Sequence, residues 1–249
     1  MTLLRLEILR VVRTRRWMLV VGVYAFFGLA GPLLARYVNE ILERFGGDEI
    51  IVTGHDPQPI DGIVQFVSNA SQLGILAVIV VAAGSLAIDA RPEIAAFLRT
   101  RVAHSRALLF PRLVVVGVTA VIALLVGTAV AWAMTASLLG ALPVGAMVLG
   151  TLLGGLYLVV VVAIVAATAT FARSVVGTVF ASLAVVIVMP IVALAPAVAP
   201  WLPSELLAAI AGLVDGDPVS TYARATITSI LAVAALVAVA VRRSEHREL

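Results

Sequence analysis

Six long apolar runs constrain this chain more than any other feature. They lie at residues 17–35, 72–90, 113–136, 147–171, 175–195 and 222–241. About 20 apolar residues in a helix cross a bilayer core of roughly 30 Å. The whole chain is 62% hydrophobic and only 12% charged, which leaves too little polar surface for a soluble globule. The sequence therefore predicts an all-α membrane protein with six transmembrane helices.

The arginines predict how these helices are oriented. Arginine near the end of a span tends to stay in the cytoplasm. Fourteen of the seventeen basic residues lie in the N-terminal segment, the second and fourth connections and the tail. Acidic residues gather instead in the first and fifth connections, at Glu40, Glu43, Asp48, Glu49, Asp56 and Asp61 and at Glu205, Asp215 and Asp217. We therefore expect both termini inside, in the cell membrane as a multi-pass protein, with membrane lipids as partners of the arginines. The arginines have no interleaved aromatic residues, so no nucleic acid is expected as a partner.

The lengths of the runs and connections predict a single domain over residues 1–249. Residues 1–16 are expected as an interfacial helix, 17–241 as the six spans and 242–249 as a cytoplasmic tail. At 100° per residue, Leu4, Ile8, Val11 and Val12 share one side of the first segment, as an interfacial helix requires. The alternative is a basic flank that only anchors the first span.

A proline-rich connection precedes the sixth span. Pro190 and Pro196 each remove a helix hydrogen bond, so we expect the fifth helix to unwind there. Ser204 is expected to cap a short apolar helix over Glu205–Val214, which is too short to cross the membrane. This helix predicts a re-entrant or interfacial outer gate, in preference to a plain loop. Its gate residues are predicted to be Trp201, Pro203 and Glu205.

Small residues recur along the fourth span. Gly150 and Gly154 form a GxxxG pair, Gly155 adjoins it, and Ala163 and Ala167 continue the stripe. Small residues at this spacing let membrane helices approach closely. The pattern predicts a contact surface, either within the subunit or against a second copy.

Several kinds of chemistry lack their residues here. Each predicted span is free of charge at its centre, where a coupled carrier usually holds a carboxylate. His55, His104 and His246 lie outside the runs, which excludes a serine–histidine pair within a span, and no His/Glu spacing predicts a metal site. A GxxxxGK[ST] phosphate loop is also missing. We therefore expect no enzyme activity and no cofactor in this chain; if ATP powers it, another chain binds the ATP.

The second connection carries a charged segment from Asp89 to Arg112. Pro92 and Glu93 suit the first turn of a helix, and Phe97 and Leu98 would be its apolar contacts. Such a helix can press into a cleft of a soluble partner. The alternative is a solvated connection that only sets topology.

The whole order of elements resembles the ABC-2 type permease family. The family's local signature lies between spans two and three. It runs, in order, through a carboxylate, Gly-Thr-Leu, a leucine-rich stretch, Pro-Val-Ser-Arg, and Gly-Lys at the start of span three. Here Asp89 or Glu93 matches the carboxylate, Ile94–Leu98 the leucine stretch, His104-Ser105-Arg106 the end of Pro-Val-Ser-Arg, and Pro111-Arg112 the Gly-Lys. The Gly-Thr pair and the proline of Pro-Val-Ser-Arg are missing.

The resemblance implies a permease subunit of an ABC exporter. It would pair with a second permease copy, or a homologous permease, and dock ABC ATPase subunits that hold ATP and magnesium. The implied coupling helix comprises Arg91, Glu93, Phe97, Leu98, Arg99, Arg101, His104, Ser105 and Arg106, with Arg173 as a secondary inner contact. Substrate would pass along spans one, two and five, with Phe26, Phe27 and Met189 as pathway candidates; for each of them the alternative is packing or lipid contact. The rival hypotheses are a stand-alone secondary carrier and a membrane scaffold without transport.

Overall fold

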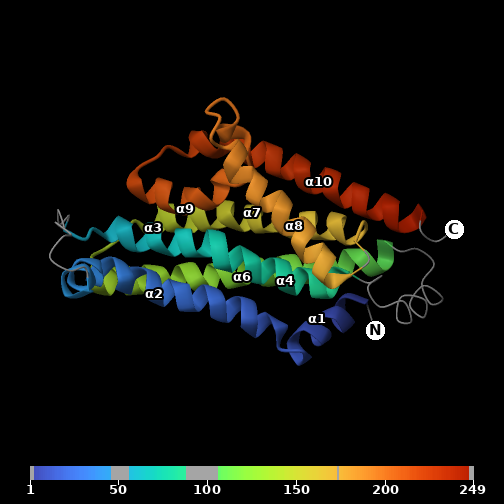
Figure 1. Cartoon of the computed structure of the whole chain (residues 1–249), viewed down its shortest axis with the longest axis horizontal. Coiled ribbons are helices and arrows are strands. Elements are labelled where there is room, and N and C mark those ends of the chain that lie inside the picture. Colours follow the sequence, from blue (N-terminus) through green and yellow to red (C-terminus); the bar gives the residue numbers. More distant parts are fainter. Residues whose placement is uncertain (1–2, 46–55, 88–105, 173, 247–249) are drawn as a thin grey trace.

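The computed structural model describes residues 3–45, 56–87, 106–172 and 174–246. All regular elements in these ranges are helical, and none is a strand. Six stretches of the described chain are long and apolar enough to span a membrane. The predicted all-α class is therefore confirmed, and so are six helices of spanning length and composition. The start of α1 (Leu3–Arg13) and the end of α10 (Ala223–His246) lie at the same end of the bundle (Figure 1).

The helices between them follow the predicted order of spans. They are α2 (Arg16–Phe45), α3 (Pro59–Asn69), the π-helix η1 (Ala70–Gly74), α4 (Ile75–Leu86), α6 (Arg106–Leu138), α7 (Val144–Ala169), α8 (Val175–Val192), the 3₁₀ helix η3 (Ala199–Trp201), α9 (Glu205–Asp215) and the 3₁₀ helix η4 (Val219–Tyr222).

A sharp turn separates α1 from α2. Arg15 has a φ of 53°, in the left-handed region that non-glycine residues rarely adopt. This conformation ends the helical path after Arg13, so that α1 and α2 lie at an angle (Figure 1). The N-terminal helix therefore ends at Arg13, before the predicted end at residue 16.

The second span starts earlier than predicted. The apolar run predicts it at residues 72–90, but the helix runs from Pro59 to Leu86 without a break. The π-helix η1 joins α3 to α4, and Gly62, Ile63 and Phe66 of α3 are buried. The polar residues of α3 lower its hydropathy. For this reason the sequence alone does not indicate that α3 is part of the second span. Residues 88–90 lie outside the described part.

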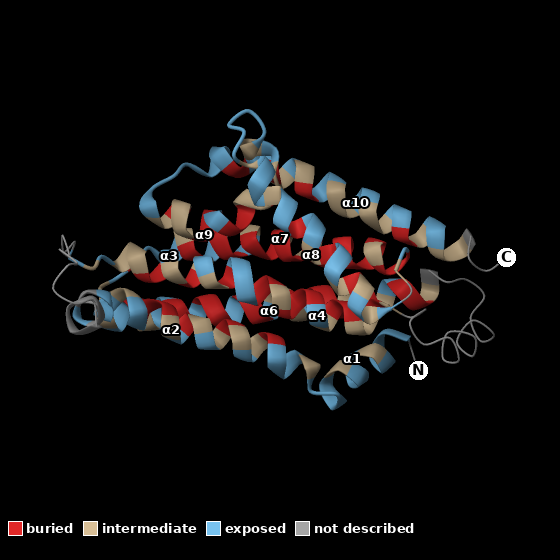
Figure 2. Cartoon of the chain, viewed as in Figure 1, coloured by how far each residue is buried: buried red, intermediate tan, exposed pale blue. Residues whose placement is uncertain are grey.

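The core is built around α7. In the apolar stretch of α7, 67% of the residues are buried, against 17% in the corresponding stretches of α8 and α10. Figure 2 shows the same contrast, with buried residues along α7 and exposed ones along α10. The buried face of α10 includes Ala225, Ser229 and Ala240, small side chains that allow close packing on the bundle. Large apolar side chains of α8, such as Phe180 at 67% exposure, face outward.

Candidate functional site

Most of the predicted docking residues lie outside the described part of the chain. These are Arg91, Glu93, Phe97, Leu98, Arg99, Arg101, His104 and Ser105, together with the secondary contact Arg173. Arg106 is the first residue of α6. The two helices that flank this segment, α4 and α6, are described, and polar contacts connect both of them to the N-terminal region.

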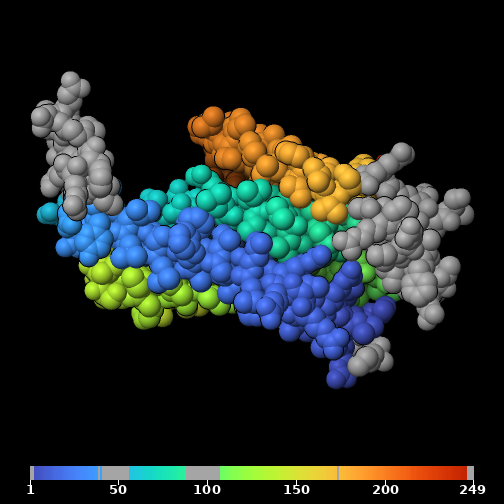
Figure 3. Space-filling model, turned by 60° about the horizontal axis from the view of Figure 1, so that its bottom comes forward, coloured from blue at the N-terminus to red at the C-terminus, as the bar shows by residue number. Residues whose placement is uncertain are grey.

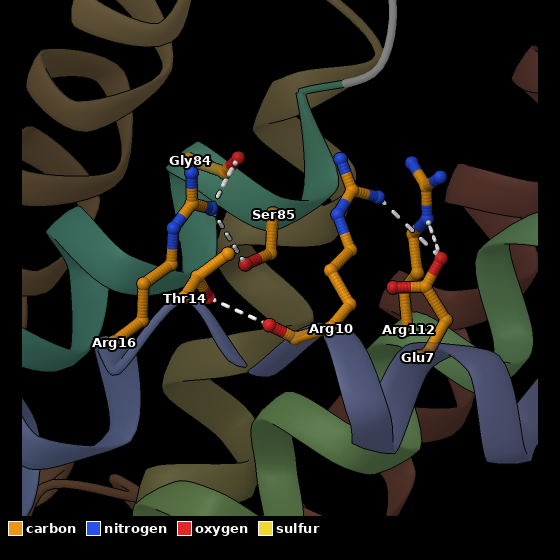
Figure 4. A network of polar contacts seen from close by, with 7 residues as sticks. All are labelled: Glu7, Arg10, Thr14, Arg16, Gly84, Ser85 and Arg112. Atoms are coloured by element: carbon orange, nitrogen blue, oxygen red, sulfur yellow. Dashed lines mark hydrogen bonds and ion pairs between the residues drawn. The ribbon is translucent and has the colours of Figure 1, made fainter. Parts of the chain in front are cut away.

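The first of these contacts is an ion pair between α1 and α6 (Figure 4). The Nε of Arg112 donates a hydrogen bond of 2.8 Å to Glu7 Oε1, and Arg10 lies 3.5 Å from the same oxygen. The Arg112 side chain is only 6% exposed and that of Glu7 17%. A charge-assisted hydrogen bond in such a dry place is stronger than a surface pair, and it neutralises an otherwise buried cation.

The second contact joins the start of α2 to the end of α4. Arg16 Nη1 donates a hydrogen bond of 2.9 Å to the carbonyl oxygen of Gly84, and it lies 3.4 Å from Ser85 Oγ (Figure 4). Neither contact is predictable from the sequence, because their partners are 68 to 105 residues apart. One signal was visible: Glu7 is the only acidic residue before Glu40.

The helix α9 is packed into the bundle against α7. Leu206 and Ile210 are fully buried. A Cβ added at Gly150 would lie 2.6 Å from the Ile210 Cα and 2.8 Å from the Ala209 carbonyl oxygen. The glycine therefore lets the two backbones approach directly. The GxxxG pattern alone does not indicate which surface the pair contacts; at Gly150 it is α9 of the same chain.

The predicted gate residues have different surroundings. Pro203 is buried, whereas Trp201 is 47% exposed. The guanidinium of Arg224 lies over the Trp201 ring, 5.4 Å from its centroid, and this cation–π contact ties the connection to the start of α10. Glu205 is half-buried at the start of α9, and burial raises its pKa above the usual range.

The predicted cap by Ser204 was wrong in its chemistry. Helix α9 does begin at Glu205, but the Ser204 side chain makes no capping hydrogen bond. Its backbone has φ −59° and ψ −30°, which is helical, whereas a capping residue needs the extended region to aim its oxygen at the first amides. The Ser204 Oγ is instead buried without a partner in the described structure. Gly216, at φ 107°, ends α9 in the left-handed conformation.

Two hollows border η1 and α4, one toward α2 and the other toward α8 and α9. Figure 3 shows α2, α4 and α8 lying side by side. The first, about 670 Å³ between α2 and the η1–α4 region, is lined by the predicted pathway residues Phe26 and Phe27, whose ring centroids are 5.2 Å apart. The third candidate, Met189, is half-buried against the core and does not line it. The second hollow, about 650 Å³, lies between α4, α8 and α9, and Glu205 lines it. Leu73 and Leu76 belong to the walls of both.

Comparison with known protein families finds no family that matches this chain, and comparisons with curated proteins and with solved structures find no match either. Its function is therefore inferred from its own residues and from the arrangement described above.

Proposed function

We propose that this chain is the transmembrane permease subunit of an ATP-driven ABC exporter of the ABC-2 type. In this proposal it lies in the cell membrane with both termini inside, pairs with a second permease subunit, and couples to separate ABC ATPase subunits that hold ATP and magnesium. The segment from Arg91 to Arg106 is the docking element, and Arg173 adds a secondary contact. The connection around Trp201, Pro203 and Glu205, together with α9, forms the outer gate.

One observation carries the proposal. The helices on both sides of the docking segment, α4 and α6, are tied to the N-terminal region by Arg16 and by the Glu7–Arg112 pair. A force applied to this segment therefore acts on the first three spans together. Such a connection suits a permease whose energy comes from a soluble partner. Binding of that partner shifts the conformational equilibrium of the permease only if their contacts differ between its two states.

Purification tests the energy source. The tagged chain, isolated from the membranes of its own cells, should bring with it an ABC ATPase in stoichiometric amount, and reconstitution with this ATPase should change the rate of ATP hydrolysis. The charge reversals Glu93→Arg and Arg106→Glu should each reduce the recovered ATPase at least several-fold. Asp215→Arg, a reversal at the end of α9, is the matched control and should leave recovery unchanged. Equal recovery with all three variants would refute the docking assignment, and gradient-driven transport by the chain alone would favour a secondary carrier.

Labelling tests the orientation. The chain contains no cysteine, so a single introduced cysteine reports its own position without background. A membrane-impermeant maleimide applied to intact cells should label Thr53→Cys in the first connection and spare His246→Cys near the C-terminus. The reverse pattern would show that the arginine distribution was misinterpreted.

A further inference from the structure

The hollow between α4, α8 and α9 has the size and lining of a small-molecule site. Its volume of about 650 Å³ lies within the range of roughly 300–1,000 Å³ that is usual for such sites. Most of its wall is apolar, from residues such as Leu76, Leu183 and Ile187. The polar residues of the lining are Ser71 and Gln72 of η1, Tyr157 of α7, and Ser204 and Glu205 at the start of α9.

One polar group comes from the middle of the second span. Gln72 lies in η1, halfway along the span Pro59–Leu86, and its side chain is exposed and lines the hollow. Within the described structure its amide has no hydrogen-bond partner. An unpaired amide is costly in an apolar surrounding, and π-helical turns inside α-helices are frequent at functional sites.

Two more polar groups come from the start of α9. Glu205 and Ser204 line the same hollow. The Ser204 Oγ is buried without a partner, and none of the described residues forms an ion pair or hydrogen bond with the Glu205 carboxylate. A hydroxyl, an amide and a carboxylate thus surround one apolar space with their bonding capacity unused.

We propose that this hollow binds an amphipathic cation, a molecule with an apolar body and one ammonium or guanidinium group. The carboxylate of Glu205 pairs with the positive charge, and the oxygens of Gln72 and Ser204 accept its N–H hydrogens. Arginine is missing from the lining, so no cationic side chain offsets the repulsion between an anion and the Glu205 carboxylate. The described residues contain no group of three metal ligands, which disfavours a bare metal ion. The inference rests on the proposed function, because it gives the permease its substrate class.

Direct binding tests this site without the ATPase. The purified full chain in phosphatidylcholine nanodiscs is incubated with radiolabelled 4-phenylbutylammonium and, separately, with 4-phenylbutyrate, an anion of similar shape, and empty nanodiscs are subtracted. We expect saturable binding of the cation only. Glu205→Gln should weaken cation binding at least tenfold, whereas Asp215→Asn, at the other end of the same helix, should not.

A second pair of variants separates charge from location. Ala208 lines this hollow and Val80 lines the neighbouring one. Ala208→Trp should abolish binding by filling the space, and Val80→Trp should preserve it. Absent cation binding, equal binding of both ions, or an unaffected Glu205→Gln variant would overturn the proposed site while leaving the ATPase partnership intact. Saturable cation binding by a chain that recovers no ATPase would keep the site and refute the permease proposal.

Discussion

Replacing Gly150 by alanine should loosen α9 from α7. Carbon atoms in contact lie about 3.5–4.0 Å apart, and the new Cβ would lie 2.6 Å from the Ile210 Cα. The two helices must therefore separate by roughly 1 Å. Both nearest groups are backbone atoms, so no side-chain rotation relieves the clash. Overpacking of this kind costs about 1–3 kcal/mol.

Gly155→Ala is the matched control in the same helix. Its Cβ would meet only Val121 side-chain carbons at 3.4 and 3.6 Å, which is ordinary contact. Both variants gain the same helix propensity, about 1 kcal/mol, so this term cancels in their difference. The melting temperature of Gly150→Ala in detergent should lie below that of Gly155→Ala by roughly 2–12 °C.

The position of α9 can be followed separately from overall stability. Leu206 is fully buried, and a cysteine there is smaller than the leucine it replaces. In the cysteine-free chain, Leu206→Cys should react slowly with maleimide in the Gly155→Ala background and many times faster in the Gly150→Ala background. Equal melting temperatures together with equal labelling rates would refute the close approach of α9 and α7.

Two further predictions concern charged groups. Glu7→Gln should destabilise the protein by about 1–3 kcal/mol because Arg112 stays buried without its counter-charge; adding Arg112→Leu should restore most of the melting temperature, and a double variant as unstable as the single one would contradict this. For Glu205, the raised pKa means that the folded state disfavours the charged form. Its contribution to stability is therefore fully present below the usual pKa of 4.5 and is lost as the pH rises through the raised value. The melting temperature of the wild type relative to Glu205→Gln should fall between pH 4 and pH 8, and a constant difference would contradict the burial of this carboxylate.

The spans were predictable because hydropathy over about 20 residues is a local property. The short helix after Ser204 was predictable for a similar reason: the prolines before it and Asp215-Gly216 after it mark its limits in the sequence. Asp61, Gln65 and Asn69 hid the beginning of the second span, since their polarity is that of a loop although α3 buries its other face.

The candidate site depended on contacts that a sequence does not display. The ion pair of Glu7 with Arg112 and the close contact of α9 with Gly150 each join elements that are far apart in the chain. The predicted capping by Ser204 was wrong because its backbone angles are helical, and residue type alone does not determine these angles. The π-helix at Ala70–Gly74 carries no sequence signature of its own, so Gln72 was not singled out. The coupling helix stays a prediction, because all of its residues except Arg106 lie outside the described part.

The π-helical turn separates two properties of the second span, namely its packing in the bundle and the side chains that it exposes at its middle. A turn of this type holds one residue more than an α-helical turn, so it behaves as a single-residue insertion absorbed within one turn. The halves before and after it, α3 and α4, keep their own buried faces. Substitutions in this short segment can therefore change which side chains the second span exposes at its middle, while the packing that holds the bundle together is preserved.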